Sequence, residues 1–342
     1  MKKRNKIFLT TLLGMSMILM VGCKNSKPAD FNTVAFSDSN KETESNKTAE
    51  SEEKAESQDE NESTRTVSTV MGDIEVPTNP QRVVVNWYIG DVIALDLNVV
   101  GYFCWAHESM PFYDKMMATT AIENWEQEEV MALEPDLIIT YSEDDYNTFN
   151  SIAPVILVPE GDITALERVL LLGEATGRSD EAKAAVDVFE TKLASTKETL
   201  QREEFKDKTF SINEDWGSGS YGVYYETGSR GGTLVYEYLG LRKPKKLEQL
   251  IEETGEGRGG LSYEVAAEYF GDYMFWFRPY DEQEGVPSEY EQTPIWQSLL
   301  AVQNEQVIRV PGKMSGLFYY SDILSLTSQL DYIANALNEF VK

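Results

Sequence analysis

The sequence has few of the side chains that metal sites and catalytic centres most often use. Its 342 residues contain one histidine, His107, and two cysteines, Cys23 and Cys104. A high-affinity zinc or manganese site normally uses several His or Cys ligands, so direct capture of a bare transition metal is not expected. A hydrolase centre would have to use His107 as its base, and no nucleophile is evident near it. We therefore expect no catalytic residues and no directly bound metal.

Nucleotide-binding motifs are also missing in their required context. Residues 217–222 and 255–260 both fit the spacing G-x-G-x-x-G. A dinucleotide fingerprint needs a strand before it and a helix after it. The first stretch precedes the β-like run 223–225, and the second follows an acidic helical segment. We predict that both are loops.

Positive charge is in short supply. Lys and Arg number 30 against 58 Asp and Glu, which gives a formal net charge of −28. The negative electrostatic field of such a chain repels nucleic acid and anionic phospholipid, so neither is expected as the working partner. A strongly anionic ligand would need a local basic pocket.

The N-terminus has the features of an export signal. Lys2, Lys3, Arg4 and Lys6 precede the apolar stretch 7–20, which is short for a membrane-spanning helix and is followed by polar sequence. The run Leu-Met-Val-Gly-Cys at 19–23 resembles the bacterial lipobox. The resemblance implies a signal peptide at 1–22 and acylation of Cys23, which would hold the protein on the outer face of the cytoplasmic membrane. Cys104 would then have no intramolecular disulfide partner.

Residues 23–65 are predicted to be a tether. The part from 39 to 65 has no aromatic residue, and alanine is its only apolar type. Such a segment cannot bury enough apolar surface to fold. We expect a disordered acidic linker between the lipidated cysteine and the folded body.

The body is predicted to be α/β, with two lobes at 66–178 and 206–342. Apolar runs typical of buried parallel strands alternate with helical patterns in both halves. The strand runs are 82–87, 99–103, 137–141, 155–159, 209–213, 221–226, 273–277 and 307–310. Between the halves, residues 179–205 have helical periodicity and no Gly or Pro, which predicts one long helix joining the lobes.

Aromatic residues cluster where the predicted strands end. In open α/β sheets, ligands bind at the carboxyl ends of the strands, and Tyr and Trp suit a bulky, partly polar ligand. Some of these rings should instead belong to the core. The aromatic candidates for a cleft between the lobes are Trp87, Trp105, Tyr141, Trp216, Tyr224, Trp276, Tyr319 and Tyr320.

Three segments carry a resemblance to a known family. Residues 80–85 (PQRVVV) resemble a P-x-R-V-V opening, residues 128–139 an L-E-x-I-x-A-L-x-P-D-L-I-I block, and residues 293–302 a P-x-W-x-x-L-x-A-V segment. All three are typical of the periplasmic binding proteins that serve ferric siderophore and cobalamin importers. This resemblance implies two lobes joined by one long helix, with the ligand cleft between them.

A fourth segment narrows the resemblance to Gram-positive ferric hydroxamate-binding lipoproteins. Residues 229–236 are similar to their W-G-R-G-G-x-x-x-Y stretch, in which the Arg reaches the iron-bound oxygens. Arg230 matches that Arg, whereas Gly228 stands where the Trp is usual. Arg278 is a second candidate for the ligand oxygens. Arginine suits this role because its planar, permanently charged fork matches hydroxamate or carboxylate oxygens.

The family also implies partners. One surface glutamate on each lobe engages the permease of the ABC importer, and the matching positions are Glu128 and Glu264. The resemblance implies a monomer with no intrinsic cofactor, which binds iron(III) only as a siderophore complex. Binding of cobalamin, or of haem through Tyr and His107, remains an alternative. An anchored hydrolase and an adhesion protein are further alternatives.

Overall fold

The structure, a computed structural model, describes residues 63–280 and 285–341. The predicted signal peptide, Cys23 and the predicted tether up to residue 62 lie outside the described residues. The described residues belong to one compact unit. Within them, no helix is both long enough and apolar enough to cross a membrane.

The N-terminal lobe is built on a parallel sheet with the strand order β5-β4-β3-β6-β7. Its strands are β3 (Val83–Asn86), β4 (Val99–Phe103), β5 (Thr120–Ala121), β6 (Leu137–Thr140) and β7 (Val155–Leu157). The helices are α1 (Ile89–Ala94), α2 (Tyr113–Met117), α3 (Gln127–Ala132), α4 (Glu143–Phe149) and α5 (Ala165–Thr176). Four predicted strands are confirmed here, and only the short β5 escaped prediction.

The C-terminal lobe has a mixed sheet with the order β10-β9-β8-β11-β12. Strands β8 (Phe210–Asp215), β11 (Tyr273–Phe277) and β12 (Val307–Val310) are parallel, while β9 (Val223–Glu226) runs antiparallel to β8 and to β10 (Arg258–Leu261). The helices include η1 (Thr233–Tyr238), α7 (Lys245–Thr254), α8 (Tyr263–Ala266), η2 (Ala267–Tyr269), η3 (Tyr290–Gln292), α9 (Pro294–Ser298), α10 (Leu300–Gln303) and η4 (Gly312–Met314). The prediction of a loop at 217–222 is confirmed, since these residues turn from β8 into β9. The prediction of a loop at 255–260 is wrong in its second half, which forms β10.

A hairpin precedes the N-terminal sheet. Strands β1 (Thr64–Thr69) and β2 (Gly72–Pro77) pair antiparallel. Arg65 donates from Nη1 to the carbonyl of Glu174 at 2.8 Å, which ties the hairpin to α5. The folded body therefore starts before residue 66, because the last residues of the predicted tether already form a strand.

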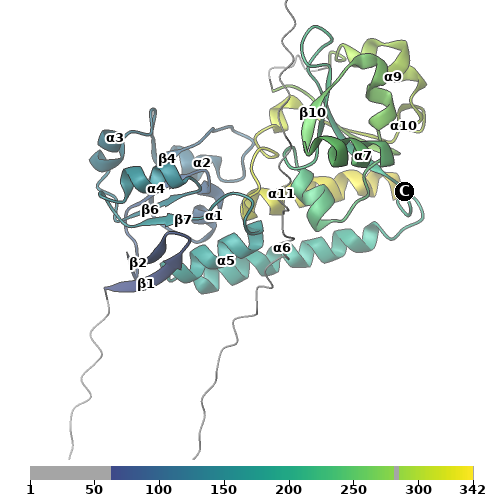
Figure 1. The fold of residues 1–342 in the computed structure, drawn as a ribbon. Coiled ribbons are helices and arrows are strands. Elements are labelled where there is room, and N and C mark those ends of the chain that lie inside the picture. The colour runs from purple at the N-terminus through teal and green to yellow at the C-terminus, as the bar shows by residue number, and fades with distance from the viewer. Residues whose placement is uncertain (1–62, 281–284, 342) are drawn as a thin grey trace, which may run out of the picture. The chain divides into compact units, whose positions relative to one another are not determined.

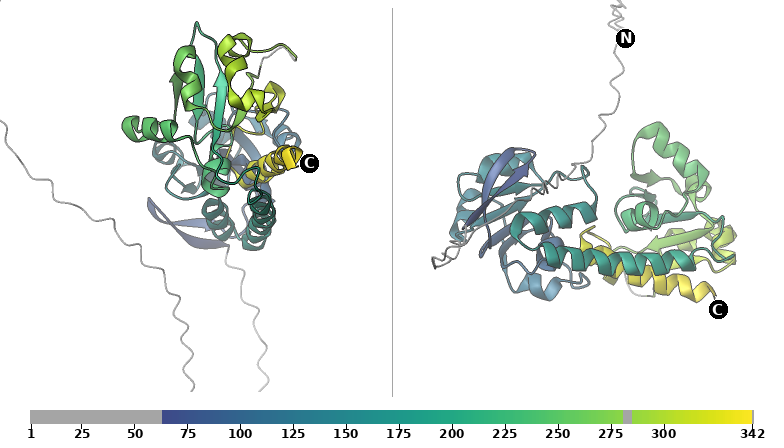
Figure 2. Two further views of the ribbon diagram at one scale, coloured as in Figure 1. Left: turned by 90° about the vertical axis from the view of Figure 1, so that its right-hand side faces the viewer. Right: turned by 90° about the horizontal axis from the view of Figure 1, so that it is seen from below.

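The lobes are joined by α6 (Ser179–Thr199), which is 21 residues long and therefore spans about 30 Å. It ends earlier than the predicted residue 205. A second helix, α11 (Ile323–Asn338), is followed by η5 (Glu339–Val341) and lies along α6 in Figure 1 and Figure 2. The chain thus passes from the N-terminal to the C-terminal lobe through one helix, α6, which is shorter than predicted, and α11 packs along it.

Strand pleating divides the apolar residues into three clusters. Val83 and Val85 of β3 belong to a large cluster that continues through the helices between the lobes to Phe275 and Phe277 of β11. Val84 belongs to a separate cluster on the other face of the N-terminal sheet. Met274 and Trp276 belong to a third cluster on the other face of the C-terminal sheet. The alternation follows from the two-residue period of a strand.

Candidate functional site

A cavity of about 290 Å³ is lined by residues of both lobes. The N-terminal lobe contributes Trp87, which follows β3, and Glu160, which follows β7. The C-terminal half of the chain contributes Gly228, Ser229, Gly231, Thr233, Phe318, Tyr319, Tyr320, Ser321 and Gln329. A larger cavity of about 480 Å³ lies within the C-terminal lobe, beside the amino ends of β8 and β11. Ligands of open α/β sheets bind at carboxyl ends, so the smaller cavity is the candidate site.

Five of the predicted aromatic residues form one ring cluster, and three of them, Trp87, Tyr319 and Tyr320, line this cavity. The Trp87 ring centroid lies 5.9 Å from Tyr141, 6.0 Å from Tyr319 and 4.8 Å from Tyr320, and Trp105 lies 4.6 Å from Tyr319. Trp87, Trp105 and Tyr141 follow β3, β4 and β6, whose carboxyl ends share one edge of the sheet. Trp105, Tyr141 and Tyr319 each keep more than a third of their surface exposed. Flat, partly exposed rings of this kind suit the organic shell of a bulky ligand.

Two other predicted rings form a second group on the C-terminal lobe. Trp216 follows β8, and its ring lies 5.9 Å from Tyr224 and 6.3 Å from Tyr221. The guanidinium of Arg258 lies 5.2 Å from the Tyr224 ring centroid. Trp216 and Tyr221 are exposed, but none of these residues lines the cavity between the lobes.

Arg230 lies beside the cavity, between Ser229 and Gly231 of its lining. Its Nε forms an ion pair with the buried Glu214 at 3.1 Å. The adjacent Ser229 donates from Oγ to Glu226 at 2.5 Å. Burial, opposed by Ser229, Arg258 and Arg230, raises the pKa of Glu226. The structure thus places Arg230 next to the predicted site, with its Nε held by a buried carboxylate.

Local backbone geometry explains why glycine stands at position 231. Arg230 has φ of 53° and Gly231 has φ of 79°, so two consecutive residues are left-handed. A Cβ at Gly231 would also lie 2.9 Å from the ring of Phe318. Trp87, on the opposite side of the cavity, has φ of 72°. Non-glycine residues in this region are strained and cluster at functional sites.

Trp276 is a correction to the sequence prediction. Its side chain has no exposed surface and packs against Trp296 at a centroid distance of 4.6 Å. It lies on the face of β11 opposite to Phe275 and Phe277, because successive side chains of a strand point to opposite faces. Trp276 is a core residue and cannot contact a ligand in the cavity.

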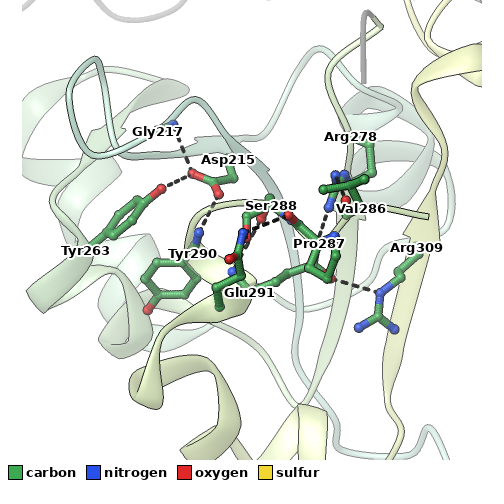
Figure 3. A network of polar contacts seen from close by, with 11 residues as sticks. Asp215, Gly217, Tyr263, Arg278, Val286, Pro287, Ser288, Tyr290, Glu291 and Arg309 are labelled. Atoms are coloured by element: carbon green, nitrogen blue, oxygen red, sulfur yellow. Dashed lines mark hydrogen bonds and ion pairs between the residues drawn. The ribbon is translucent and has the colours of Figure 1, made fainter. Parts of the chain in front are cut away.

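Arg278 is the second correction. Figure 3 shows its guanidinium held by Glu291, to which Arg309 also donates from Nε at 3.1 Å. Arg278 further donates from Nη2 to the carbonyl of Val286 at 2.5 Å, and its side chain is only 10% exposed. These residues line a separate pocket of the C-terminal lobe. Arg278 thus stabilises the loop before η3 and is not placed at the cavity between the lobes.

The two predicted docking glutamates are both exposed. Glu128 lies in the first turn of α3, and Glu264 lies in the first turn of α8. A hydrogen bond from Ser262 lowers the pKa of Glu264. Each lobe therefore presents one such carboxylate at the surface.

A buried ionic network that the sequence did not reveal lies behind the cavity wall. Arg168 of α5 binds Asp91 of α1 from Nε at 2.6 Å and the carbonyl of Ser321 from Nη2 at 3.0 Å. Asp91 accepts from the amide of Ile323 at 2.8 Å, and Asp322 caps α11 by accepting from the Ser325 amide at 2.8 Å. The network joins three helices and holds the segment that carries Tyr319, Tyr320 and Ser321. Its members are far apart in sequence, so no local pattern could have identified them.

His107, the possible haem ligand from the sequence, and the nearby Cys104 have local partners. His107 Nδ1 lies 3.0 Å from Ser109 Oγ, and its ring lies 5.2 Å from Trp105. Burial, opposed by a hydrogen bond from Tyr320, raises the pKa of the Cys104 thiol to about 12. A thiol with so high a pKa is a poor nucleophile. Over residues 63–280 and 285–341, no group of three or more His, Cys, Asp or Glu side chains is placed to hold a metal ion.

Comparisons with known proteins agree with this architecture. The family model described as "Periplasmic binding protein" matches residues 106–314. The iron(3+)-hydroxamate-binding protein YxeB of Bacillus subtilis (strain 168) is 32% identical over 277 residues, which cover 80% of this chain and 85% of YxeB. The solved structure of the FhuD protein from S. pseudintermedius is 27% identical, with a TM-score of 0.65 over 80% of this chain and 98% of that one.

A further solved structure contains a ligand. FhuD2 from Staphylococcus aureus with bound ferrioxamine B is 26% identical, with a TM-score of 0.63 over 77% of this chain and 100% of that one. The family match spans more than half of this chain, and the lobed α/β architecture is shared. The chain therefore belongs to the periplasmic binding protein family, and its activity is solute binding rather than catalysis.

Proposed function

We propose that this protein captures an iron(III)–siderophore complex of the hydroxamate type in the cavity between its lobes and delivers it to an ABC permease. The observation that carries the proposal is the aromatic cavity, lined from both lobes, in a chain 32% identical to an iron(3+)-hydroxamate-binding protein. The siderophore would fill the coordination sphere of the iron, so the protein would need no metal ligands of its own.

The aromatic rings and Arg230 would contact different parts of the ligand. Trp87, Trp105 and Tyr319 offer apolar faces for the organic shell of the chelate. Arg230 would donate to hydroxamate oxygens while Glu214 holds its guanidinium in place. Cobalamin and haem are the competing ligands, since both are also large and could pack against aromatic side chains.

Tryptophan fluorescence of the full chain tests the proposal, because Trp87 and Trp105 lie in the ring cluster. Ferrioxamine B, ferrichrome, ferric citrate, a ferric catecholate, haemin and cobalamin would each be titrated. We expect saturable quenching by a ferric hydroxamate at submicromolar concentration. Quenching by haemin or cobalamin alone would replace the proposed ligand.

We also propose that the protein is a lipoprotein, anchored through acylated Cys23 to the outer face of the cytoplasmic membrane. The support is the basic start, the apolar stretch at 7–20 and the lipobox-like residues 19–23. Membrane fractionation tests the anchor. Cys23→Ala should release the protein from the membrane fraction, whereas Cys104→Ala should leave it there.

Glu128 and Glu264 are the proposed contacts with the permease. Both are exposed and lie on different lobes. Glu128→Lys and Glu264→Lys should abolish uptake of the ferric siderophore by cells while leaving its affinity for the protein unchanged. Glu143→Lys, an exposed first-turn position on α4, is the matched control and should leave uptake unchanged.

A further inference from the structure

Among the described residues that line the cavity between the lobes, Glu160 alone carries a formal charge at neutral pH. It follows β7 and is exposed at the cavity. Within residues 63–280 and 285–341, its carboxylate has no ion-pair or hydrogen-bond partner. Its charge is therefore not compensated by a neighbouring side chain.

Two oppositely charged pairs lie close to the cavity, while Asp91 and Asp322 share the single Arg168 behind its wall. Arg230 binds Glu214 at 3.1 Å, and Arg258 binds Glu226 at 3.2 Å. Each pair sums to zero, so the pairs add little net field at the cavity. Burial, Asp145 and Glu160 together raise the pKa of Tyr141, so Asp145 is a further negative charge near the ring cluster, although it does not line the cavity.

The aromatic rings next to Glu160 add to the attraction for a cation. Trp87, Tyr319 and Tyr320 line the same cavity, with ring centroids 4.8 to 6.0 Å apart. Ring faces attract ammonium groups through their quadrupole, and a carboxylate adds a direct ion pair. Glu160 is exposed, so an ammonium group could pair with it while keeping part of its hydration.

The charge of a ferric trihydroxamate is set by its pendant group. Three hydroxamate anions balance the charge of iron(III), so the chelate core is neutral. A cavity of about 290 Å³ is at the lower end of ligand-site volumes. Pendant groups at the rim therefore have a larger share in recognition than they would in a fully enclosing site.

We propose that Glu160 is a specificity-determining residue that makes the cavity prefer ferric hydroxamates with a pendant ammonium group over neutral or carboxylate-bearing ones. This inference rests on the proposed function and adds the charge class of the ligand. It assigns the preference to one side chain rather than to the acidity of the whole protein.

A charge series built on one chelate tests the inference. Ferrioxamine B carries a pendant ammonium, its N-acetyl derivative is neutral, and its N-succinyl derivative carries a carboxylate. We expect the full chain to bind ferrioxamine B about three- to tenfold more tightly than the N-acetyl form, because a partly exposed ion pair supported by rings has a modest strength. The N-succinyl form should bind most weakly. These differences should shrink as the salt concentration rises.

Two variants separate the local charge from the global one. Glu160→Gln should bring the three affinities within about twofold of one another, with the N-acetyl form unchanged from wild type. Asp162→Asn removes the same charge from an exposed position that does not line the cavity, and it should keep the wild-type preference. Thermal unfolding of both variants would check that they fold.

The outcomes distinguish this inference from the proposed function. Equal binding of all three ligands by the wild type would overturn the role of Glu160 but leave hydroxamate capture standing. Equal weakening of all three ligands in Glu160→Gln would likewise overturn a charge-specific role. Binding of none of them would contradict the proposed function itself.

Discussion

Replacing Asp322 with asparagine should stabilise the protein at neutral pH. Asp322 is buried at the N-terminus of α11. It lies so close to Gly90 that a Cβ added to Gly90 would be 2.0 Å from Asp322 Oδ1. It shares Arg168 with Asp91, so two buried carboxylates face one guanidinium. Burial and the charge of Asp91, opposed by hydrogen bonds from Ser325 and by Arg168, raise the pKa of Asp322 to about 6.

The sign of the effect follows from linkage. Because the pKa is higher in the folded state than the ordinary 3.8, the folded protein binds more protons than the unfolded chain between about pH 4 and 6. The free energy of unfolding therefore falls as the pH rises through this window, and the penalty is complete above pH 6. A pKa raised from 3.8 to about 6 corresponds to about 3 kcal/mol, which is the upper limit of the gain. Asparagine removes the charge and remains a good N-cap.

Urea unfolding at several pH values measures this effect. Asp322→Asn should gain about 1–3 kcal/mol above pH 6 and nothing at pH 4. Asp331→Asn is the control, since Asp331 is exposed on the same helix and pairs with Lys192; it should change stability by less than about 1 kcal/mol. A loss of stability in Asp322→Asn at pH 7, or a gain that does not depend on pH, would refute the reasoning.

Three further substitutions test the site. Gly228→Trp should tighten ferric hydroxamate binding about two- to tenfold, since a Cβ there meets nothing within 4 Å. Gly219→Trp is the control, because Gly219 is equally open but lies outside the cavity, and it should leave the affinity unchanged. Equal effects of the two variants in a fluorescence titration would contradict this prediction. Arg230→Ala should weaken ferrioxamine B by about 1.5–3 kcal/mol, whereas the exposed Arg242→Ala should not; an unchanged affinity in calorimetry would remove Arg230 from the site. Arg278→Ala should lower the free energy of unfolding in urea by about 3–5 kcal/mol, because it leaves Glu291 buried with only Arg309. The affinity for the ligand should not change. A loss of binding without a loss of stability would show that Arg278 contacts the ligand.

The strands and the main aromatic cluster were predictable from the sequence. Apolar runs identified β3, β4, β6, β7, β11 and β12, because buried parallel strands need apolar residues on both faces. The predicted runs at 209–213 and 221–226 also overlap β8 and the antiparallel β9, although both strands contain charged residues. Rings that directly follow such strands, as Trp87 and Tyr141 do, must lie at the carboxyl edge of the sheet. That placement depends on chain order alone, so it could be inferred without coordinates.

Side-chain direction and long-range pairing were not predictable in the same way. Trp276 lies within a strand, where a shift of one residue decides which face a side chain meets. Arg278 follows the same strand, but its partner Glu291 comes from η3, on the far side of a loop. No sequence pattern marked Glu160 as a site residue either, because it is one glutamate among many acidic residues. Its position matters only once the cavity around it is known.

The pairing of α6 with α11 shows a further limit. Periodicity predicted a helix at 179–205, since these residues carry a recurring apolar stripe, and α11 carries such a stripe as well. It could not show that the two stripes face each other, because amphipathic patterns give the direction of a face but not the identity of its partner.

Equilibrium dialysis of the full chain against iron-labelled ferrioxamine B tests the central claim most directly. The account predicts saturable uptake of one iron per protein, a dissociation constant below about 1 μM, in the range of specific ligand sites, and displacement by unlabelled ferrioxamine B but not by cobalamin. Retention of no label at micromolar ligand, with the protein shown to be folded, would contradict it.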